Sequence, residues 1–231
     1  MGLEERYDQF YASNLKDESL PDIIVSGWPK NRTEAIVFVP GEGATILDVG
    51  CGNGLLLNQF RTRYRHLIGL EFSSQRLKQA TINLSACNFT GICGSAEIMS
   101  EIETGSVDRI ISADTIEHIP DVYAAASELY RVLKPNGQLV INTPNIAFLK
   151  KRALLFFGRF PSTSQPNEGL GSDVLFDGGH LHYFTFRSLT LVLQRAGFSV
   201  THNIGYGKLG RFHNIYPPLL SGGAQLVAIK E

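Results

Sequence analysis

The stretch LDVGCGNG, residues 47–54, is the first place in the sequence where residue types and spacing point to chemistry. Asp48 ends an apolar run, and glycine follows at every second position, as Gly50, Gly52 and Gly54. Glycine permits positive φ and lets a ligand approach the backbone closely. Glu71 ends the next apolar run, where a carboxylate that binds ribose hydroxyls is expected. The spacing predicts a nucleotide-type ligand held over this turn.

Histidines supply the candidate acid–base groups. His180 and His182 lie in the polar, aromatic segment DGGHLHYFT (177–185), and His118 ends the segment DTIEH. Imidazole takes up and releases protons near neutral pH. Gly178 and Gly179 allow the chain to bend, so an imidazole of this segment can lie over the ligand.

Strands and helices must alternate to bring these residues to one edge of a sheet. Strand-type runs occur at 45–50, 66–72, 88–93, 106–114 and 138–144. Helical spacing occurs between them at 55–64, 73–86, 96–102 and 122–134, and again at 186–197, where Gly197 supplies the stop. This alternation predicts a parallel sheet with helices on both faces. Two final runs, FSVTHNIGY and AQLVAIKE, have no predicted helix between them and so predict an antiparallel pair.

Composition excludes several classes of function. The formal net charge of −1 and the pI near 6.6 argue against a nucleic-acid binder, which normally has a basic excess. Cys51, Cys87 and Cys93 are odd in number and lack metal-ligand spacing, which fits a reducing compartment. The N-terminus has no apolar signal core, and no apolar run approaches the ~20 residues of a membrane span. We expect a soluble cytoplasmic protein without membrane insertion.

The motif ILDVGCGNG resembles the first motif of class I S-adenosylmethionine-dependent methyltransferases. The resemblance extends from about residue 30 to the C-terminus, through GLEFS, VDRIISADTIEHIPD and ELYRVLKPNGQLVINTPN. It implies an α/β fold: a Rossmann-like, seven-stranded, mostly parallel sheet with an antiparallel C-terminal hairpin and helices on both faces. We expect a single domain over 1–231, with an N-terminal helical cap at 1–30 and a substrate-lid insertion at 145–185.

The resemblance also implies S-adenosylmethionine as cofactor and S-adenosylhomocysteine as product. Asp48 would order the glycine turn, Glu71 would accept from the ribose hydroxyls, and Phe72 would lie against the adenine. Ser95 stands where many relatives have an aspartate that accepts from the adenine amino group, and Asp114 would close the far side. The expected cofactor residues are Asp48, Gly50, Cys51, Gly52, Gly54, Glu71, Phe72, Ser95, Ala96 and Asp114.

A sulfonium methyl group is already activated, so the main task of such an enzyme is to align a nucleophile with it. The expected reaction is O-methylation of a hydroxyl or carboxylate of a small molecule in a biosynthetic pathway. A hydroxyl needs a base, whereas a carboxylate or thiolate does not. We expect His182 or His180 to be that base, ahead of His118. Tyr7, Tyr11 and Tyr183 are the expected substrate and lid side chains.

Alternative functions remain open at this point. The glycines do not match the NAD fingerprint G-x-G-x-x-G, whose third glycine position is Leu55, so an NAD-dependent oxidoreductase is the less favoured interpretation. Some quinone-biosynthesis O-methyltransferases hold a divalent cation with two acidic residues and a histidine, which Asp114, Glu117 and His118 match loosely. A hard cation needs more oxygen ligands than these supply, so no metal is expected.

The layout of residues 143–198 is similar to that of the methionine-biosynthesis protein MetW and of methyltransferases in glycan and natural-product pathways. This resemblance implies a different function, an S-adenosylmethionine-binding partner of an acyltransferase. In an enzyme, we expect 145–185 to enclose a cavity; in a partner subunit, we expect it to expose an apolar face. The basic and apolar stretch 149–160 fits a lid, a partner helix or a membrane-surface contact, of which the lid is favoured. A homodimer also remains open.

Overall fold

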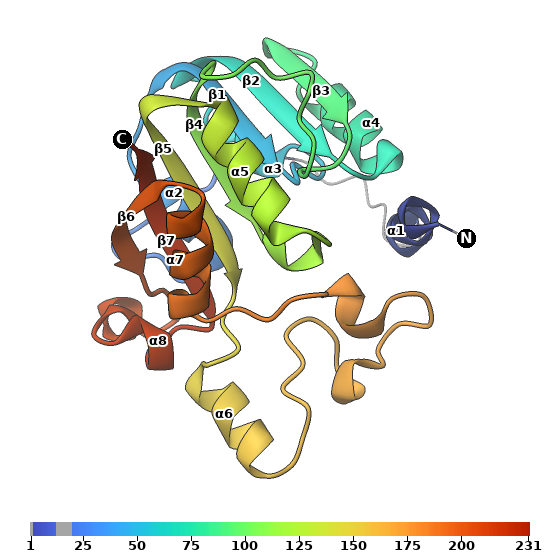
Figure 1. Cartoon of the computed structure of the whole chain (residues 1–231), viewed down its shortest axis with the longest axis vertical. Coiled ribbons are helices and arrows are strands. Elements are labelled where there is room, and N and C mark those ends of the chain that lie inside the picture. The colour runs from blue at the N-terminus through green and yellow to red at the C-terminus, as the bar shows by residue number, and fades with distance from the viewer. Residues whose placement is uncertain (1, 13–19) are drawn as a thin grey trace.

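A twisted sheet of seven strands runs through the computed structural model, which describes residues 2–12 and 20–231 (Figure 1). The strand order is β3-β2-β1-β4-β5-β7-β6. Strands β1 to β5 pair in parallel, and β7 is antiparallel to both β5 and β6. The strands are β1 Gly43–Val49, β2 Tyr64–Glu71, β3 Phe89–Cys93, β4 Val107–Ala113, β5 Leu133–Pro144, β6 Phe198–Ile204 and β7 Gly223–Lys230. The predicted fold class is confirmed.

Helices cover both faces of this sheet, as Figure 1 shows. The α-helices are α1 Leu3–Ala12, α2 Arg32–Phe38, α3 Leu55–Asn58, α4 Ser74–Asn83, α5 Val122–Val132, α6 Leu149–Phe156, α7 Phe186–Arg195 and α8 Pro217–Leu220. Short 3-10 helices are η1 Ile116–His118, η2 Asn167–Gly169, η3 Phe176–Gly179 and η4 Gly210–Asn214. No helix in the part of the chain that the structure describes is long and apolar enough to cross a membrane.

The core is divided by the sheet, because successive strand residues point to opposite faces. Leu47 and Ile110 pack on one face with α5 and α7, whereas Ile46 and Ile111 pack on the other with α2, α3 and α4. Parallel strands buried on both faces need such continuous apolar runs. Because β1 to β5 run in parallel, their carboxyl ends all lie at the same edge of the sheet.

Polar residues set the helix ends as the sequence predicts. Ser73 caps α4 by accepting from the backbone N–H of Arg76, and Asp121 caps α5 by accepting from Tyr123 and Ala124. Gly197, at φ +106°, follows α7 in a conformation that suits glycine. The caps at Ser73 and Asp121 fix where the loops that follow β2 and β4 end.

Several predicted element boundaries are wrong. Residues 96–102 form turns and no helix, although Met99 and Ile102 are buried against the sheet. The helix predicted over 55–64 ends at Asn58, and Tyr64 already begins β2. The segment between β6 and β7 contains η4 and α8, which the sequence pattern did not predict. Apolar spacing alone cannot separate a buried turn from a short helix.

Candidate functional site

A cleft of about 230 Å³ opens beside the carboxyl ends of β1, β2 and β4. Strand order reverses at β1, which lies between β2 and β4, and ligands of open α/β sheets bind at such a switch point. The lining residues are Tyr7, Val49, Gly50, Leu70, Glu71, Phe72, Arg76, Gly94, Ser95, Ala96, Glu97, Asp114, Thr115, His118, Ile119 and Pro120.

Gly50, which opens the glycine turn after β1, lines the cleft, whereas the predicted residues Cys51, Gly52 and Gly54 lie outside its lining. The carbonyl oxygen of Leu70 accepts from the N–H groups of Gly50 and Cys51, at 2.8 and 3.1 Å. Gly50 has φ +80°, and a Cβ there would collide with the side chain of Thr115. Any other residue at position 50 would therefore be disfavoured for two reasons: its backbone would be strained at this φ, and its Cβ would clash with Thr115. Cys51 is buried, and burial raises the pKa of its thiol well above the ordinary value.

The turn is held by Glu71 and not by Asp48, contrary to expectation. Glu71 Oε2 accepts from the N–H of Gly52 at 2.8 Å, and Oε1 accepts from Ser73 N at 3.0 Å. Neither carboxyl oxygen of Asp48 has a hydrogen-bond partner among the described residues. Glu71 lines the cleft and keeps further lone pairs for ligand hydroxyls.

Asp48 is a buried carboxyl group near the cleft, with only 1% of its surface exposed. Burial raises its pKa to about 8, and the nearby Glu71 carboxylate adds to the shift. A buried carboxylate without partners is costly, so it either binds a proton or faces a cation. Without a ligand the Asp48 carboxyl group is therefore largely protonated near pH 7, and a cation placed beside it would favour its ionised form.

The wall formed after β3 differs from the one expected at Ser95. The Ser95 hydroxyl donates to Glu97 Oε2 at 2.8 Å, and Glu97 Oε1 accepts from Asp121 N at 2.7 Å. Ser95, Ala96 and Glu97 all line the cleft, so a carboxylate is present on this wall two residues after the expected place. Phe72 lies at the cleft with its ring edge-on to Tyr7, at 6.0 Å between centroids.

Asp114 lies on the opposite wall, where β4 ends. Its backbone has φ +50°, an uncommon conformation for a residue other than glycine, and its N–H donates to the carbonyl of Asn142. Its carboxylate pairs with Arg32 from the start of α2. Strained backbone at a ligand edge is a frequent mark of functional sites.

His118 lies in the cleft wall with one ring nitrogen fixed by the protein. Nδ1 is 3.1 Å from the carbonyl oxygen of Gly179 and 3.0 Å from the hydroxyl of Tyr7. A carbonyl oxygen only accepts, so Nδ1 carries the proton and Nε2 keeps its lone pair. Burial lowers the pKa of His118, which keeps the ring neutral near pH 7. The geometry is that of a base held ready to accept a proton.

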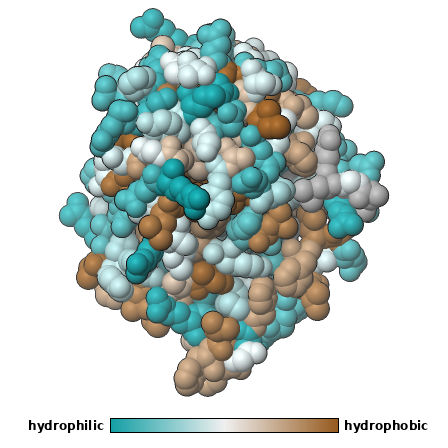
Figure 2. All heavy atoms as spheres, in the orientation of Figure 1, coloured by the Kyte–Doolittle hydropathy of each residue, from teal (hydrophilic) through white to brown (hydrophobic). Residues whose placement is uncertain are grey.

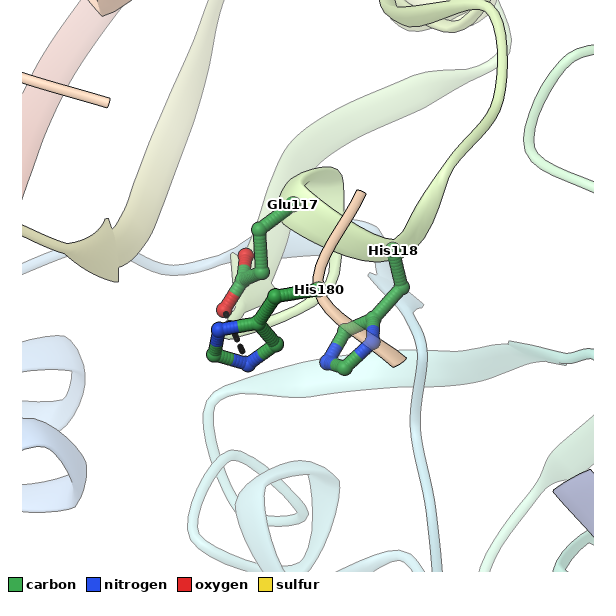
Figure 3. Close-up of side chains that lie close together, drawn as sticks. All are labelled: Glu117, His118 and His180. Atoms are coloured by element: carbon green, nitrogen blue, oxygen red, sulfur yellow. Dashed lines mark ion pairs between the residues drawn. The ribbon is translucent and has the colours of Figure 1, made fainter. Parts of the chain in front are cut away.

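His180 and Glu117 lie next to His118 in Figure 3. The rings of His118 and His180 meet edge to face, with centroids 4.6 Å apart. His180 Nδ1 is 2.6 Å from the Thr163 hydroxyl, and its Nε2 lies 3.9 Å from Glu117 Oε1. Burial lowers the pKa of His180 to about 4 and raises that of Glu117, so this contact is not an ion pair near neutral pH.

The side chain of Glu117 is 1% exposed, and only one of its two carboxyl oxygens accepts a hydrogen bond. Oε2 accepts from the Thr143 hydroxyl at 2.9 Å, whereas Oε1 has no hydrogen-bond partner among the described residues. Glu117, His118 and His180 each offer a ligand atom within 4.8 Å of the others, so these are the side chains that could hold a metal ion. The cation set considered from the sequence, Asp114, Glu117 and His118, differs from this group, because Asp114 pairs with Arg32.

The other predicted side chains lie outside the cleft lining. His182 has Nε2 3.2 Å from the carbonyl oxygen of Pro120, and the Tyr183 hydroxyl donates to Asp177 at 3.1 Å. The side chain of Tyr11 lies outside the described part of the structure. Tyr7 lines the cleft, and no residue of α6 does, so α6 does not cover the cleft as a lid.

Sequence reasoning missed several residues of the site. Arg76 and Glu97 line the cleft, and Asp177 holds the loop that carries His180. Glu117 was considered from the sequence only as a cation ligand, and its role as a buried carboxyl group was not predicted. Glu117 and Glu97 are charged residues in otherwise apolar or small surroundings, which is a signal of partnered burial. Nothing in the local pattern marks Arg76, which lies on a helix of mixed polarity.

Comparison with known proteins gives a consistent family. A family described as a methyltransferase domain matches residues 18–203. The ubiquinone biosynthesis O-methyltransferase of Idiomarina loihiensis is 29% identical over 121 residues, which cover 52% of this chain and 48% of that protein. The chain therefore spans about half the length of the curated relatives it matches.

Solved structures share the fold at low sequence identity. The cyclase SpnF superposes with a TM-score of 0.67 at 18% identity, covering 99% of this chain and 95% of that one. An S-adenosylmethionine-dependent methyltransferase from Mesorhizobium loti superposes with a TM-score of 0.64 at 17% identity, covering 86% and 95% of the two chains. These likenesses establish the architecture alone, since a fold hosts more than one chemistry.

Proposed function

Because the chain belongs to the methyltransferase domain family, we propose that it transfers a methyl group from S-adenosylmethionine to an oxygen of a small molecule. The observation that carries the proposal is the presence of His118 in the same cleft as Gly50 and Glu71. One wall of this cleft suits a nucleoside, and the other holds a neutral imidazole with a free lone pair. That combination fits the alignment of an activated methyl group with an oxygen nucleophile.

The residues of the cleft fit S-adenosylmethionine on structural grounds. Glu71 has lone pairs for ribose hydroxyls, Gly50 presents bare backbone to the cleft, and Phe72 offers a flat apolar surface for adenine. The unpartnered carboxyl of Asp48 suits a ligand with cationic groups, which S-adenosylmethionine has and NAD lacks near its pyrophosphate. The bound cofactor supplies an activated methyl group, and the protein positions its acceptor.

We assign the base to His118, ahead of His180 and His182. His118 Nε2 carries the lone pair and the ring lines the cleft, whereas His182 is held beside Pro120 outside it. His180 borders His118 but lies outside the cleft lining, with its Nδ1 held by the Thr163 hydroxyl. A substrate hydroxyl is the acceptor that needs such a group.

Single-turnover methyl transfer tests this function. The purified protein with S-adenosylmethionine should add one methyl group to members of a panel of phenols, alcohols and carboxylic acids, detected by mass spectrometry. Glu71→Ala should weaken S-adenosylhomocysteine binding strongly in calorimetry. His118→Ala should slow the chemical step ~10²–10⁴-fold with little change in cofactor affinity. The wild-type rate should fall on the acid side only below the ordinary histidine pKa, because burial lowers the pKa of His118.

His182→Ala is the matched control, since that ring lies outside the cleft lining, where it contacts the carbonyl of Pro120 and the ring of Phe184. A carboxylate substrate, which needs no base, would show as transfer that His118→Ala leaves unchanged. Binding of NAD without any response to S-adenosylhomocysteine would contradict the proposal as a whole.

A partner subunit of an acyltransferase is the second candidate, because residues 145–185 show the feature expected of it. Helix α6 has no buried residue and exposes apolar side chains. The cleft is present, but none of the residues that line it belongs to 145–185, so this segment does not enclose it as expected of an enzyme. Absence of methyl transfer across the panel, together with a stable stoichiometric acyltransferase partner on co-purification, would replace the enzyme by the subunit.

A further inference from the structure

We propose that the exposed end of α6 is a docking surface for an anionic lipid bilayer. The apolar tip consists of Leu149, Leu155, Phe156 and Phe157, which are 53%, 65%, 84% and 76% exposed. The rings of Phe156 and Phe157 contact each other, with centroids 5.2 Å apart. Contiguous exposed apolar groups of this kind mark interaction sites in soluble proteins. This inference concerns a surface away from the cleft and does not rest on the proposed reaction.

Three residues of the helix form an apolar stripe, and Leu155 of the tip lies about 120° around the helix from Leu149. At about 100° per residue, Leu149, Ala153 and Phe156 project within about 60° of one another. Half-buried Lys151 and Leu154 lie on the opposite side, toward the rest of the protein. The outward stripe is therefore apolar, and it is free to enter the boundary between lipid headgroups and acyl chains.

Positive charge flanks this stripe on both sides. Lys150 and Arg152 are exposed and lie on opposite sides of it, and Arg159 follows the helix. Residues 145–167 contain four basic and no acidic side chains, in a chain whose formal net charge is −1. Arg159 is paired with Glu168, so the free exposed charges are those of Lys150 and Arg152. This local excess is complementary to anionic headgroups.

The apolar tip also protrudes from the rest of the molecule. Helix α6 projects from the lower end of the molecule in Figure 1, away from the sheet, and apolar atoms gather at the same end in Figure 2. With eight residues the helix is too short to cross a bilayer, so it would lie at the interface.

A lipid surface fits these features better than a protein partner. Protein interfaces are depleted of lysine, and their apolar cores are rimmed by polar groups of mixed charge. Here the exposed residues Lys150 and Arg152 beside the two phenylalanines are basic, and the nearby carboxylate of Glu168 is paired with Arg159. Interfacial helices combine phenylalanine and leucine on one face with lysine and arginine beside it.

Vesicle co-sedimentation tests the proposal. The full chain should sediment with vesicles of phosphatidylcholine that contain about a third phosphatidylglycerol, and far less with phosphatidylcholine alone. Phe156→Ser/Phe157→Ser should lower binding at least tenfold, because two large apolar side chains no longer enter the interface. Lys150→Glu/Arg152→Glu should lower binding to the anionic vesicles by roughly fivefold or more per charge, and salt should do the same.

Two matched variants control for nonspecific effects. Ile24→Ser removes an equally exposed apolar side chain (84%) elsewhere, and Arg187→Glu/Lys208→Glu reverses two exposed basic residues away from the tip. Both should bind as the wild type does. The proposal is overturned if the wild type stays in solution with both vesicle types or if the phenylalanine variant binds normally. It is also overturned if the tip variants convert a dimer to a monomer in light scattering, since the occupant is then a second copy.

Discussion

Three buried carboxyl groups of this protein differ because their hydrogen-bond partners differ. Asp48 and Glu117 are buried with unpartnered oxygens, and burial raises the pKa of each. Asp177 is equally buried, yet hydrogen bonds from the Ser162 hydroxyl and from backbone N–H groups outweigh burial and hold its pKa well below the usual value. The same residue type is thus a neutral acid at Asp48, near the cleft, and a permanent anion at Asp177, in the insertion.

Replacing Asp48 with asparagine tests the first of these environments. A raised pKa means that stability declines as pH rises from the ordinary value of 3.8 toward about 8. Wild-type protein without ligand should therefore lose a few kcal/mol of unfolding free energy between pH 5 and pH 8. The Asp48→Asn variant should lose clearly less unfolding free energy over the same pH interval. It should also bind S-adenosylhomocysteine more weakly than the wild type does. Urea unfolding at the two pH values measures the first effect, and calorimetry the second.

The contribution of Glu117 has the same sign, so the comparison is made between the variant and the wild type at each pH. An Asp48→Asn protein whose stability falls with pH as steeply as that of the wild type would show that Asp48 ionises freely in the folded chain.

At the scale of elements, the insertion after β5 is organised around Asp177. Its carboxylate accepts from the backbone N–H groups of Thr163, Ser164 and Gln165, and from the hydroxyls of Ser162 and Tyr183. Thr163 in turn contacts His180 Nδ1. The insertion also joins the fold through N–H groups of residues 181 and 182, which donate to the carbonyl of Glu117. One carboxylate therefore positions the histidine beside the cleft.

Asp177→Ala should loosen this insertion while the sheet stays folded. Its removal leaves several buried donors without an acceptor, at a cost of roughly 3 kcal/mol. Limited proteolysis should cut within 158–176 much faster than in the wild type, and circular dichroism should change little. Asp173→Ala, which removes an exposed carboxylate of the same insertion, is the control. Equal resistance of both variants to protease would show that the insertion is held by its other contacts.

The elements were predictable where one periodicity dominates, and the insertion was not. The strand-type runs and the caps at Ser73, Asp121 and Gly197 depend on neighbours in sequence, so they are visible in the chain. Asp177 and Glu117 act through residues 12 to 26 positions away, and no local pattern indicates such contacts. The position of the cleft could be predicted from Gly50 and Glu71 in the sequence. Which histidine lines it could not, because that depends on how the insertion folds back toward the sheet.

At the scale of the whole molecule, three distant parts of the chain meet at the cleft. The Tyr7 hydroxyl of α1 lies 3.0 Å from His118 Nδ1 and donates to the carbonyl of Gly179 at 3.2 Å. Asp8, on the same helix, accepts from the hydroxyl of Ser73 at the start of α4. Helix α1 and the insertion therefore meet at His118, which lines the cleft, and the N-terminal cap remains a prediction.

Two substitutions at Tyr7 distinguish the effect of its ring packing from the effect of its hydroxyl group. Tyr7→Ala removes a buried ring that contacts Phe72, and the loss of an aromatic contact with its apolar area should weaken S-adenosylhomocysteine binding about tenfold. Tyr7→Phe keeps the ring, so affinity should stay near wild type, while the methyl-transfer rate should fall because Nδ1 of His118 loses one of its partners. Calorimetry and single-turnover assays distinguish the two effects. Tyr123→Ala, which truncates an exposed tyrosine on α5, should change neither. If Tyr7→Ala binds the ligand as tightly as the wild type, helix α1 does not cap the cleft.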